Sequence, residues 1–367
     1  MEFIRSSTKN VWNTFSQYIT YDAFNITVPS SEINILGETI PSAETKAEIE
    51  SVQAQLNEIR SKIPWMRYRS NFDRIGEKGL TSDNGWGCMI RAGQMMTFVA
   101  LAKVIKLEKK DYHEFLGTFF REKSDGNPLG HFGIQHFVLE AEEEFKVEPG
   151  SWFKPTTFVL TLKKILKDLP EFDNLRMYNI LDNTIIWRKL EKKAFKSSSQ
   201  LETKEEVIEK LKNQPWDNSV ILTLSSLFGL SRPDELYSSI IISFTKMKSF
   251  VGMLGGQANS AYYFIGANSK NNFYYLDPHF CSYARSDYDD EEAVQKDYFL
   301  YKVKEVPLSK MSTTMTFCFL LSSNEHLKEF HDVYTKLSEE LGDDFFICDQ
   351  LEKTKDSDSD DIIETFD

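Results

Sequence analysis

The two halves of this chain have different hydrophobic periodicities, and this contrast limits which fold it can adopt. Residues 43–63 have the pattern of an amphipathic helix that Pro64 ends, with apolar side chains at spacings of three and four: Ile49, Val52, Leu56, Ile59 and Ile63. In the second half, β-branched and aromatic residues gather in short runs, at 219–224, 261–266, 273–278 and 314–321. Helices followed by strand-rich segments predict an α+β fold whose strands form an antiparallel sheet.

Other segments of the chain also predict helices in the first half, and further helices and turns among the strands of the second half. Apolar spacing predicts further helices from Cys88 to about Ile105 and over 156–169, 233–247 and 324–341. Turn residues at 268–272 predict a hairpin between the neighbouring strands, and 33–41 is expected to be a short strand ending in a glycine turn. We divide the chain into a flexible N-terminal segment (1–32), one folded domain with a small inserted subdomain (33–341) and an acidic disordered tail (342–367).

Composition narrows the class of function. The 367 residues are 41% hydrophobic with a net charge of −13, which suits a folded protein and argues against nucleic acid as the main partner. The four cysteines form no CxxC pair and the six histidines no ligand-spaced cluster, so we expect neither a metal site nor a cofactor. The first residues lack the apolar stretch of a signal peptide, and no run of about 18 apolar residues occurs. We therefore expect a cytoplasmic, monomeric protein with free thiols.

Cys88 stands behind a Gly-Trp-Gly turn, at the expected start of a helix. Cysteine attacks as a thiolate, and its free pKa of about 8.5 leaves only a small fraction ionised at neutral pH. The partial positive charge and unpaired N–H groups of a helix N-terminus stabilise that anion. The motif is typical of a nucleophile, but a buried, inert thiol fits this local pattern equally well.

A thiol nucleophile needs a base, and His279 is the best candidate among the histidines. It follows a run of strand formers, and Asp277 is placed to hold one ring nitrogen while the other faces the thiol. By itself, the Asp-Pro-His triplet fits a turn with an N-capping aspartate better than a catalytic pair. The residues alone also leave open whether Tyr68 enters the site or is an ordinary packed aromatic.

Taken together, several stretches resemble the autophagy cysteine proteases of the Atg4 family, whose catalytic core is similar to that of papain. They occur in the family's order, from about residue 33 to residue 280: ILG (35–37), WMRYRSNF (65–72), TSDNGWGCMIRAGQM (81–95), SWFKPTTFVLTLKKIL (151–166), LDNTII (181–186), GGQANSAYYFIG (255–266) and YLDPHF (275–280). TSDxGWGC with a downstream LDPH, in that order, is highly specific for this family.

The resemblance implies a role for each matching residue. Cys88 corresponds to the nucleophile, His279 to the general base and Asp277 to the carboxylate that orients the histidine. Tyr68 corresponds to a tyrosine that helps to hold the oxyanion. Trp152 corresponds to a tryptophan that covers the substrate groove together with a mobile loop, which here consists of Gln257, Ala258, Asn259 and Ser260.

The resemblance also implies a substrate. Atg4 proteases cleave ubiquitin-like proteins of the Atg8/LC3 type after their C-terminal glycine. The released amine belongs to a peptide in precursor processing, or to phosphatidylethanolamine when the protein is removed from a membrane. A membrane is therefore implied only through the lipidated substrate.

Three stretches depart from the family's pattern. The loop has Ala258 where proline is frequent, and LFGL (227–230) lacks the arginine of the family's RLGL-like stretch, with Arg232 nearby. DDFFIC (343–348) has Cys348 where the family's Atg8-binding motif has an aliphatic residue. A hydrophobic end to the last helix explains that stretch about as well.

Two other interpretations stay open. A non-catalytic protein would keep a groove for ubiquitin-like tails, although its expected mark, loss of the cysteine, histidine or aspartate, is missing here. Another thiol chemistry on a similar core, such as acyl transfer or amidase action, is also compatible with a single cysteine nucleophile. The long-range match at Trp152, 255–266 and LDPH favours the protease.

Overall fold

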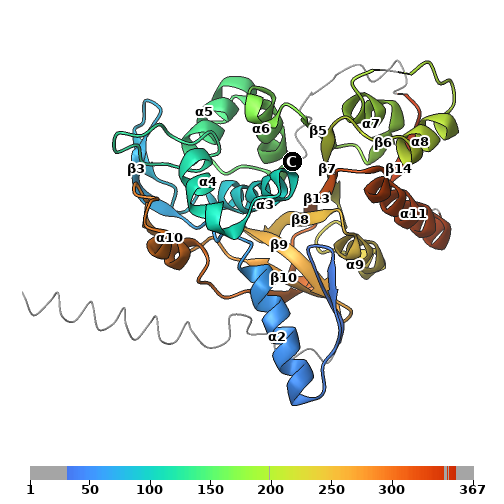
Figure 1. Ribbon diagram of the computed structural model, residues 1–367, viewed down its shortest axis with the longest axis horizontal. Helices are drawn as coiled ribbons and strands as arrows, with labels where there is room; N and C mark the ends of the chain where they lie inside the picture. The colour runs from blue at the N-terminus through green and yellow to red at the C-terminus, as the bar shows by residue number, and fades with distance from the viewer. Residues whose placement is uncertain (1–30, 198, 343–344, 346, 353–367) are drawn as a thin grey trace, which may run out of the picture.

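A central sheet organises the chain (Figure 1). The computed structural model describes residues 31–197, 199–342, 345 and 347–352, so most of the expected N-terminal segment (1–32) and the last part of the expected tail (353–367) lie outside the described residues. The main path of the sheet runs, in spatial order, through β12 (Lys304–Pro307), β10 (Asn272–Leu276), β9 (Ser260–Asn268), β8 (Phe250–Gln257), β13 (Thr314–Leu321), β7 (Ser219–Leu227) and β5 (Leu175–Ile180). A hairpin of β1 (Ile33–Ile35) and β2 (Glu38–Ile40) joins it at β9.

Two short sheets complete the strands of the described residues. One contains β11 (Ser282–Tyr283), β3 (Arg69–Ile75) and β4 (Leu80–Ser82). The other pairs β14 (Cys348–Gln350) with β6 (Thr184–Ile186).

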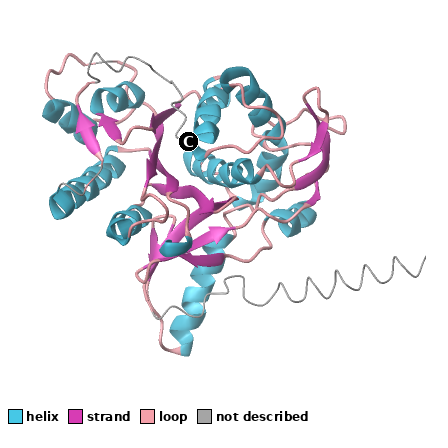
Figure 2. Ribbon diagram, turned by 180° about the vertical axis from the view of Figure 1, so that it is seen from behind, coloured by secondary structure: helices cyan, strands magenta, loops and turns pink. Residues whose placement is uncertain are grey.

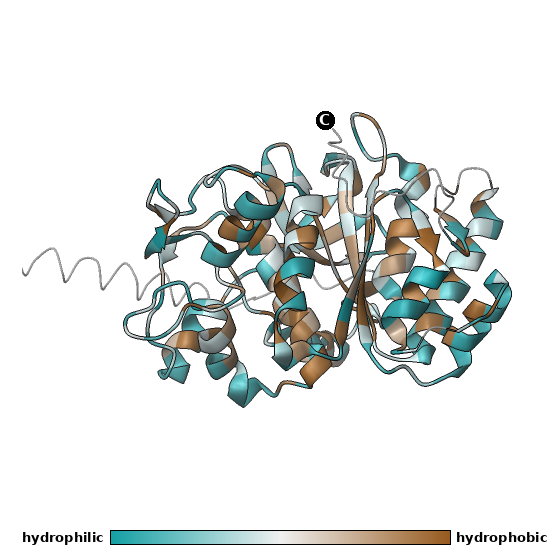
Figure 3. Cartoon of the chain, turned by 90° about the horizontal axis from the view of Figure 1, so that it is seen from above, coloured by the Kyte–Doolittle hydropathy of each residue, from teal (hydrophilic) through white to brown (hydrophobic). Residues whose placement is uncertain are grey.

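Alternation along the strands places a hydrophobic core on each face of the main sheet. In β13, one core takes Met315, Phe317, Phe319 and Leu321 and the other takes Cys318 and Leu320. Both faces of the main sheet therefore carry apolar side chains, and helices cover each face and shield these side chains from water. Figure 3 shows the strands between two groups of helices.

Helices lie on both sides of the main sheet (Figure 2), and their buried side chains divide between the two cores. The first core contains side chains of α2 (Lys46–Arg60), α3 (Cys88–Ile105), α4 (Tyr112–Phe119), α5 (Ile134–Phe145), α6 (Pro155–Lys167) and α10 (Glu291–Tyr298). The second contains side chains of α7 (Trp187–Ala194), α8 (Lys204–Asn213), α9 (Ser238–Lys246) and α11 (Asn324–Leu341). The most deeply buried helix is α3, which packs against β8 and β9 on one side and α5 and α6 on another.

Most predicted elements are confirmed, including the helix over 324–341 and the antiparallel hairpin of β9 and β10. The predicted antiparallel sheet is wrong at one edge, where β5 pairs with β7 in parallel. The long connection between them, which includes α7 and α8, makes this crossover possible. The helix predicted over 233–247 begins only at Ser238, because Asp234 first caps a 3-10 turn.

The expected disordered tail from residue 342 is also wrong for residues 347–352. Cys348–Gln350 forms β14, and Phe345 and Ile347 are buried in the second core. The indole of Trp187 donates a hydrogen bond of 2.6 Å to Asp349. Of the stretch 343–348, expected either as a binding motif or as the end of a helix, Phe345 and Ile347 belong to the second core and Cys348 begins β14, while residues 343, 344 and 346 lie outside the described residues.

Candidate active site

Cys88 is the first residue of α3, and two glycines shape the turn before it. Gly85 has a φ of +90°, a conformation that L side chains rarely adopt. A Cβ on Gly87 would lie 2.3 Å from Asp83 Oδ2, so only glycine fits there. Gly87 is also the N-cap and offers no side-chain oxygen to the first turn. The helix N-terminus is thereby left available to stabilise a negative charge.

A buried ion-pair network holds this turn. The backbone oxygen of Asp83 accepts hydrogen bonds from the N–H groups of Trp86 and Gly87, at 3.1 and 2.9 Å. Its carboxylate accepts from Arg91 Nε at 2.8 Å, and Arg91 also pairs with Glu122. All three charged side chains are buried, so the charge of Arg91 compensates the charges of the two carboxylates in the protein interior.

Asp277 and His279 follow the end of β10 and lie against each other. The carboxylate oxygen Oδ1 of Asp277 is 2.7 Å from His279 Nδ1 and also accepts the backbone N–H of His279 at 3.0 Å. The second ring nitrogen, Nε2, is buried and makes no regular hydrogen bond. The group with which this ring interacts electrostatically, besides Asp277, is the thiol of Cys88.

These contacts lower the pKa values of Asp277 and Cys88 and raise the pKa of His279. Burial alone would raise the pKa of Asp277, but hydrogen bonds from His279 and Lys304 outweigh it and lower the pKa to about 2. Burial would lower the pKa of His279, but Asp277 and Cys88 raise it to about 9. Burial would raise the pKa of the Cys88 thiol, yet the imidazole, the Ala261 backbone N–H and Tyr68 together lower it. Both the lowered pKa of the thiol and the raised pKa of the imidazole favour a thiolate beside an imidazolium.

Tyr68 lies at the same point, between the turn and the histidine. Its ring packs edge-on against the ring of His279, with centroids 5.4 Å apart, and its backbone N–H donates to Pro278 O at 3.0 Å. Burial, and secondly the negative charge of Cys88, raise the pKa of its phenol above the ordinary value. The hydroxyl therefore stays protonated and able to donate a hydrogen bond.

The structure also locates the tryptophan and the loop of the resemblance. Trp152 is half exposed, and its indole N–H donates to Gly85 O at 2.6 Å, beside the turn that precedes Cys88. Residues 257–260 form the tight turn between β8 and β9, where Gln257 pairs with Ser260 and Asn259 has a φ of +61°. Ala258 and Asn259 are exposed, and the next residue along is Ala261, whose backbone N–H interacts with Cys88.

Several residues of the site could not be identified from the sequence. Lys304 pairs with Asp277, and Trp65 donates its indole N–H to Asp277 O at 2.7 Å. Asp83, Arg91 and Glu122 were also missed. An arginine on an otherwise apolar helix signals that a buried acid must accompany it, but no pattern in the chain says which acid.

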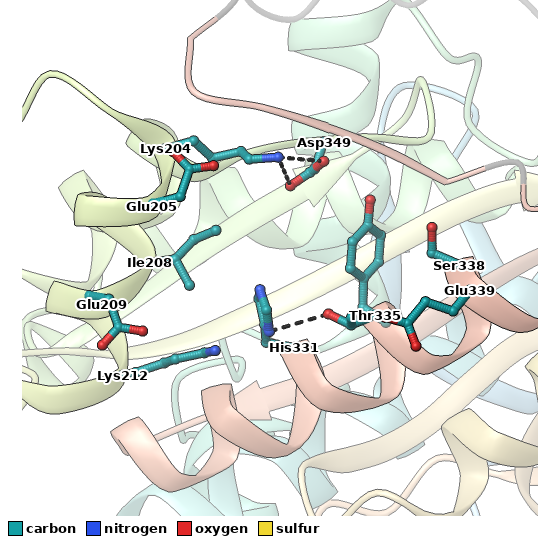
Figure 4. A pocket seen from close by; sticks show the side chains of 11 residues that line it. Lys204, Glu205, Ile208, Glu209, Lys212, His331, Thr335, Ser338, Glu339 and Asp349 are labelled. Carbon is teal, nitrogen blue, oxygen red and sulfur yellow. Dashed lines mark hydrogen bonds and ion pairs between the residues drawn. The ribbon is translucent and has the colours of Figure 1, made fainter. Parts of the chain in front are cut away.

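No group of three or more His, Cys, Asp or Glu side chains that could hold a metal occurs among the described residues. A hollow of about 400 Å³ lies between α8 and α11, where Lys204 pairs with Asp349 and His331 with Thr335 (Figure 4). None of the predicted site residues lines it.

In the described part of the chain, one helix, α3, has the length and apolar composition to cross a membrane, but 78% of it is buried inside the protein. It is the central helix of the first core.

A thiol beside an imidazole that a carboxylate holds is the arrangement of a thiol hydrolase. The model of the peptidase C54 catalytic domain matches residues 52–333 of this chain. The "Probable cysteine protease atg4" of Schizosaccharomyces pombe is 28% identical over 264 residues, covering 72% of this chain and 71% of that protein. "Cysteine protease ATG4A" of Gallus gallus is 30% identical over 268 residues, covering 65% and 68%. The chain therefore belongs to the peptidase C54 family of cysteine proteases, as its resemblance to Atg4 proteins predicted.

Proposed function

We propose that this protease cleaves Atg8-type ubiquitin-like proteins after their C-terminal glycine, with Cys88 as nucleophile, His279 as general base and acid, and Asp277 as the orienting carboxylate. The proposal is carried by the 2.7 Å contact of Asp277 with His279, together with the lowered pKa of the Cys88 thiol beside that imidazole. A nucleophile at the N-terminus of a buried helix and a histidine after a sheet strand correspond to a papain-like core.

The reaction divides into two displacements. Cys88 Sγ attacks the carbonyl carbon of the terminal glycine, the C–N bond breaks, and the His279 imidazolium gives its proton to the leaving amine. Water then attacks the thioester while His279 takes a proton from it. The C–S bond breaks, which restores the thiolate beside the imidazolium, and the glycine carboxylic acid leaves and loses its remaining proton to solvent.

The negative oxygen that forms in each step needs hydrogen-bond donors. We assign this role to the Cys88 backbone N–H at the start of α3 and to the Tyr68 hydroxyl. Loss of one such donor costs about 3 kcal/mol of transition-state stabilisation. Tyr68→Phe should therefore reduce kcat about 100-fold and change KM little.

Trp152 and the 257–260 turn, which both lie near Cys88, explain why the substrate must have glycine before the cleaved bond. We propose that Trp152, held on Gly85, and the 257–260 turn narrow the groove so that a residue without a side chain fits. Leu230, at the end of LFGL, is 95% exposed, and we assign it to apolar contact with the body of the substrate.

The released amine is that of a peptide or of phosphatidylethanolamine. With the lipid delivered by the substrate, the enzyme acts as a cytoplasmic monomer.

The test uses an Atg8-type precursor that carries a tag after its terminal glycine. Wild type and a Cys281→Ala control, which lacks an exposed thiol two residues after His279, should release the tag. Cys88→Ala should bind the precursor and release nothing. Turnover by Cys88→Ala would overturn the assignment, and binding without release by wild type would support a non-catalytic protein.

The ionisation of the site gives a second expectation for the same assay. His279 must be protonated beside the thiolate, and its pKa is raised to about 9. We expect kcat/KM to fall as pH rises through about 9, because the imidazolium that protonates the amine is lost. A rate that stays constant up to pH 10.5 would contradict this role of His279.

A further inference from the structure

The Asp277 carboxylate has two oxygens, and only one of them faces the histidine. Oδ1 is used by His279, through both its backbone and its ring. Oδ2 is 2.6 Å from Nζ of Lys304, on β12. Lys304 reaches this position because β12 pairs with β10, where it lies opposite Tyr275, two residues before Asp277.

Aromatic contacts fix the lysine in place. Its ammonium group lies 5.2 Å from the centre of the Phe280 ring. Phe280 packs edge-on against Trp65, with centroids 5.5 Å apart, and Trp65 donates its indole N–H to the backbone oxygen of Asp277. Lys304, Phe280 and Trp65 thus form a closed set of contacts around Asp277.

We propose that Lys304 is a positioning residue of this site, which holds the Asp277 carboxylate in the plane that His279 needs and sets the proton affinity of the imidazole–thiol pair. The proposal rests on the function proposed above for His279 and Cys88. Lys304 acts through Asp277 and has no assigned contact with the substrate.

The sign of its effect follows from the order of charges. Cys88, His279, Asp277 and Lys304 alternate between negative and positive at neutral pH. Removing the cation at the end of this series makes every remaining group easier to protonate, so each pKa rises. Among the described residues, the phenols of Tyr68 and Tyr262 lie against His279 and interact with Cys88, and the phenol of Tyr275 interacts with Asp277; burial raises the pKa of each phenol. They stay neutral and do not alter the sign.

The experiment measures the thiol directly, without a protein substrate. Alkylation by iodoacetamide is followed on the Cys88 peptide by mass spectrometry between pH 4 and pH 10.5, and kcat/KM is measured over the same range. The variants are Lys304→Met, which removes the charge, and Lys304→Arg, which keeps it. Lys302→Met, an exposed lysine on the same segment, is the matched control.

For Lys304→Met we expect the acid and alkaline limbs of both profiles to move to higher pH by about half a unit, the shift of a partly screened charge nearby. We also expect kcat to fall about 5- to 20-fold with KM nearly unchanged. Lys304→Arg should restore both limbs, and Lys302→Met should match the wild type.

Two failures are distinguishable. A wild-type Cys88 that alkylates no faster at pH 7 than exposed Cys281 would defeat the proposed function itself. A fast wild-type Cys88 whose limbs do not move in Lys304→Met would overturn only the role of Lys304. The role of Lys304 would also be overturned if Lys304→Met lowered kcat/KM equally at every pH and Lys304→Arg did not restore it. Lys304 would then have only a structural role.

Discussion

The two parts of the candidate site are supported in different ways. The nucleophile turn (residues 83–88) rests on buried charges, because Asp83, Arg91 and Glu122 are all nearly inaccessible to water. The histidine arm (residues 277–279) rests on a short turn after β10 and on Lys304, whose side chain is 42% exposed. A buried network of charges fixes the position of the backbone around it, but the loss of one of its side chains destabilises the fold. A partly exposed ion pair changes the proton affinity of its partner with little effect on the free energy of unfolding. We therefore expect changes in the turn to reduce stability, and changes in the arm to reduce the rate.

The largest expected effect is on the rate. Asp277→Asn keeps the shape of the side chain but removes the charge that raises the pKa of His279. We expect kcat/KM to fall about 10³- to 10⁴-fold at pH 7, with little change in Tm. Asp289→Asn, on an exposed loop residue, is the control. A loss of less than tenfold would mean that the arm does not depend on its carboxylate.

The corresponding change in the turn is Arg91→Met. It leaves Asp83 and Glu122 buried without their cation, so we expect the free energy of unfolding to fall by about 3–5 kcal/mol. Chemical denaturation measures this, with exposed Arg74→Met as a control that should change stability by less than about 0.5 kcal/mol. If Arg91→Met and Arg74→Met had equal free energies of unfolding, the nucleophile turn would not depend on its buried charges, and the contrast with the histidine arm would be lost.

A smaller effect is expected from Gly87→Ala. The new Cβ would overlap Asp83 Oδ2, so the turn must shift at a cost of about 1–3 kcal/mol. Alkylation of Cys88 should slow at the same time, because the helix start moves relative to His279. Gly255→Ala, where a Cβ comes no closer than 3.3 Å to the Phe264 ring, should have a milder effect. If both alanines behaved alike, the turn would not be sterically fixed.

The smallest effect is expected from Trp152→Phe, which keeps an aromatic ring but removes the hydrogen bond to Gly85. The loss should be about 0.5–1.5 kcal/mol, seen as a few-fold rise in KM for the tagged precursor with kcat nearly constant. A fall in kcat with KM unchanged would place Trp152 in the chemical step instead of the groove.

The sequence predicted those features of the protein that local patterns encode. The Cys88 turn and the Asp-Pro-His triplet are each contained within a few residues, and the helix 324–341 follows from its periodicity. Lys304 and Trp65 could not be predicted, because they meet Asp277 only through the pairing of β10 with β12 and a contact across 212 positions. The same reason explains the missed parallel pairing of β5 with β7 and of β14 with β6, which local composition does not encode.

The central claim is that Cys88 is the thiol that attacks the terminal glycine. The most direct test is an Atg8-type protein whose C-terminal glycine carries a vinyl methyl ester, an electrophile that a nucleophilic thiol captures covalently. Peptide mapping after reaction with the wild-type enzyme should find the adduct on Cys88 alone, although Cys281 and Cys348 are more exposed. An adduct on Cys281 or Cys348, or none from an enzyme that still releases the tag, would contradict the account.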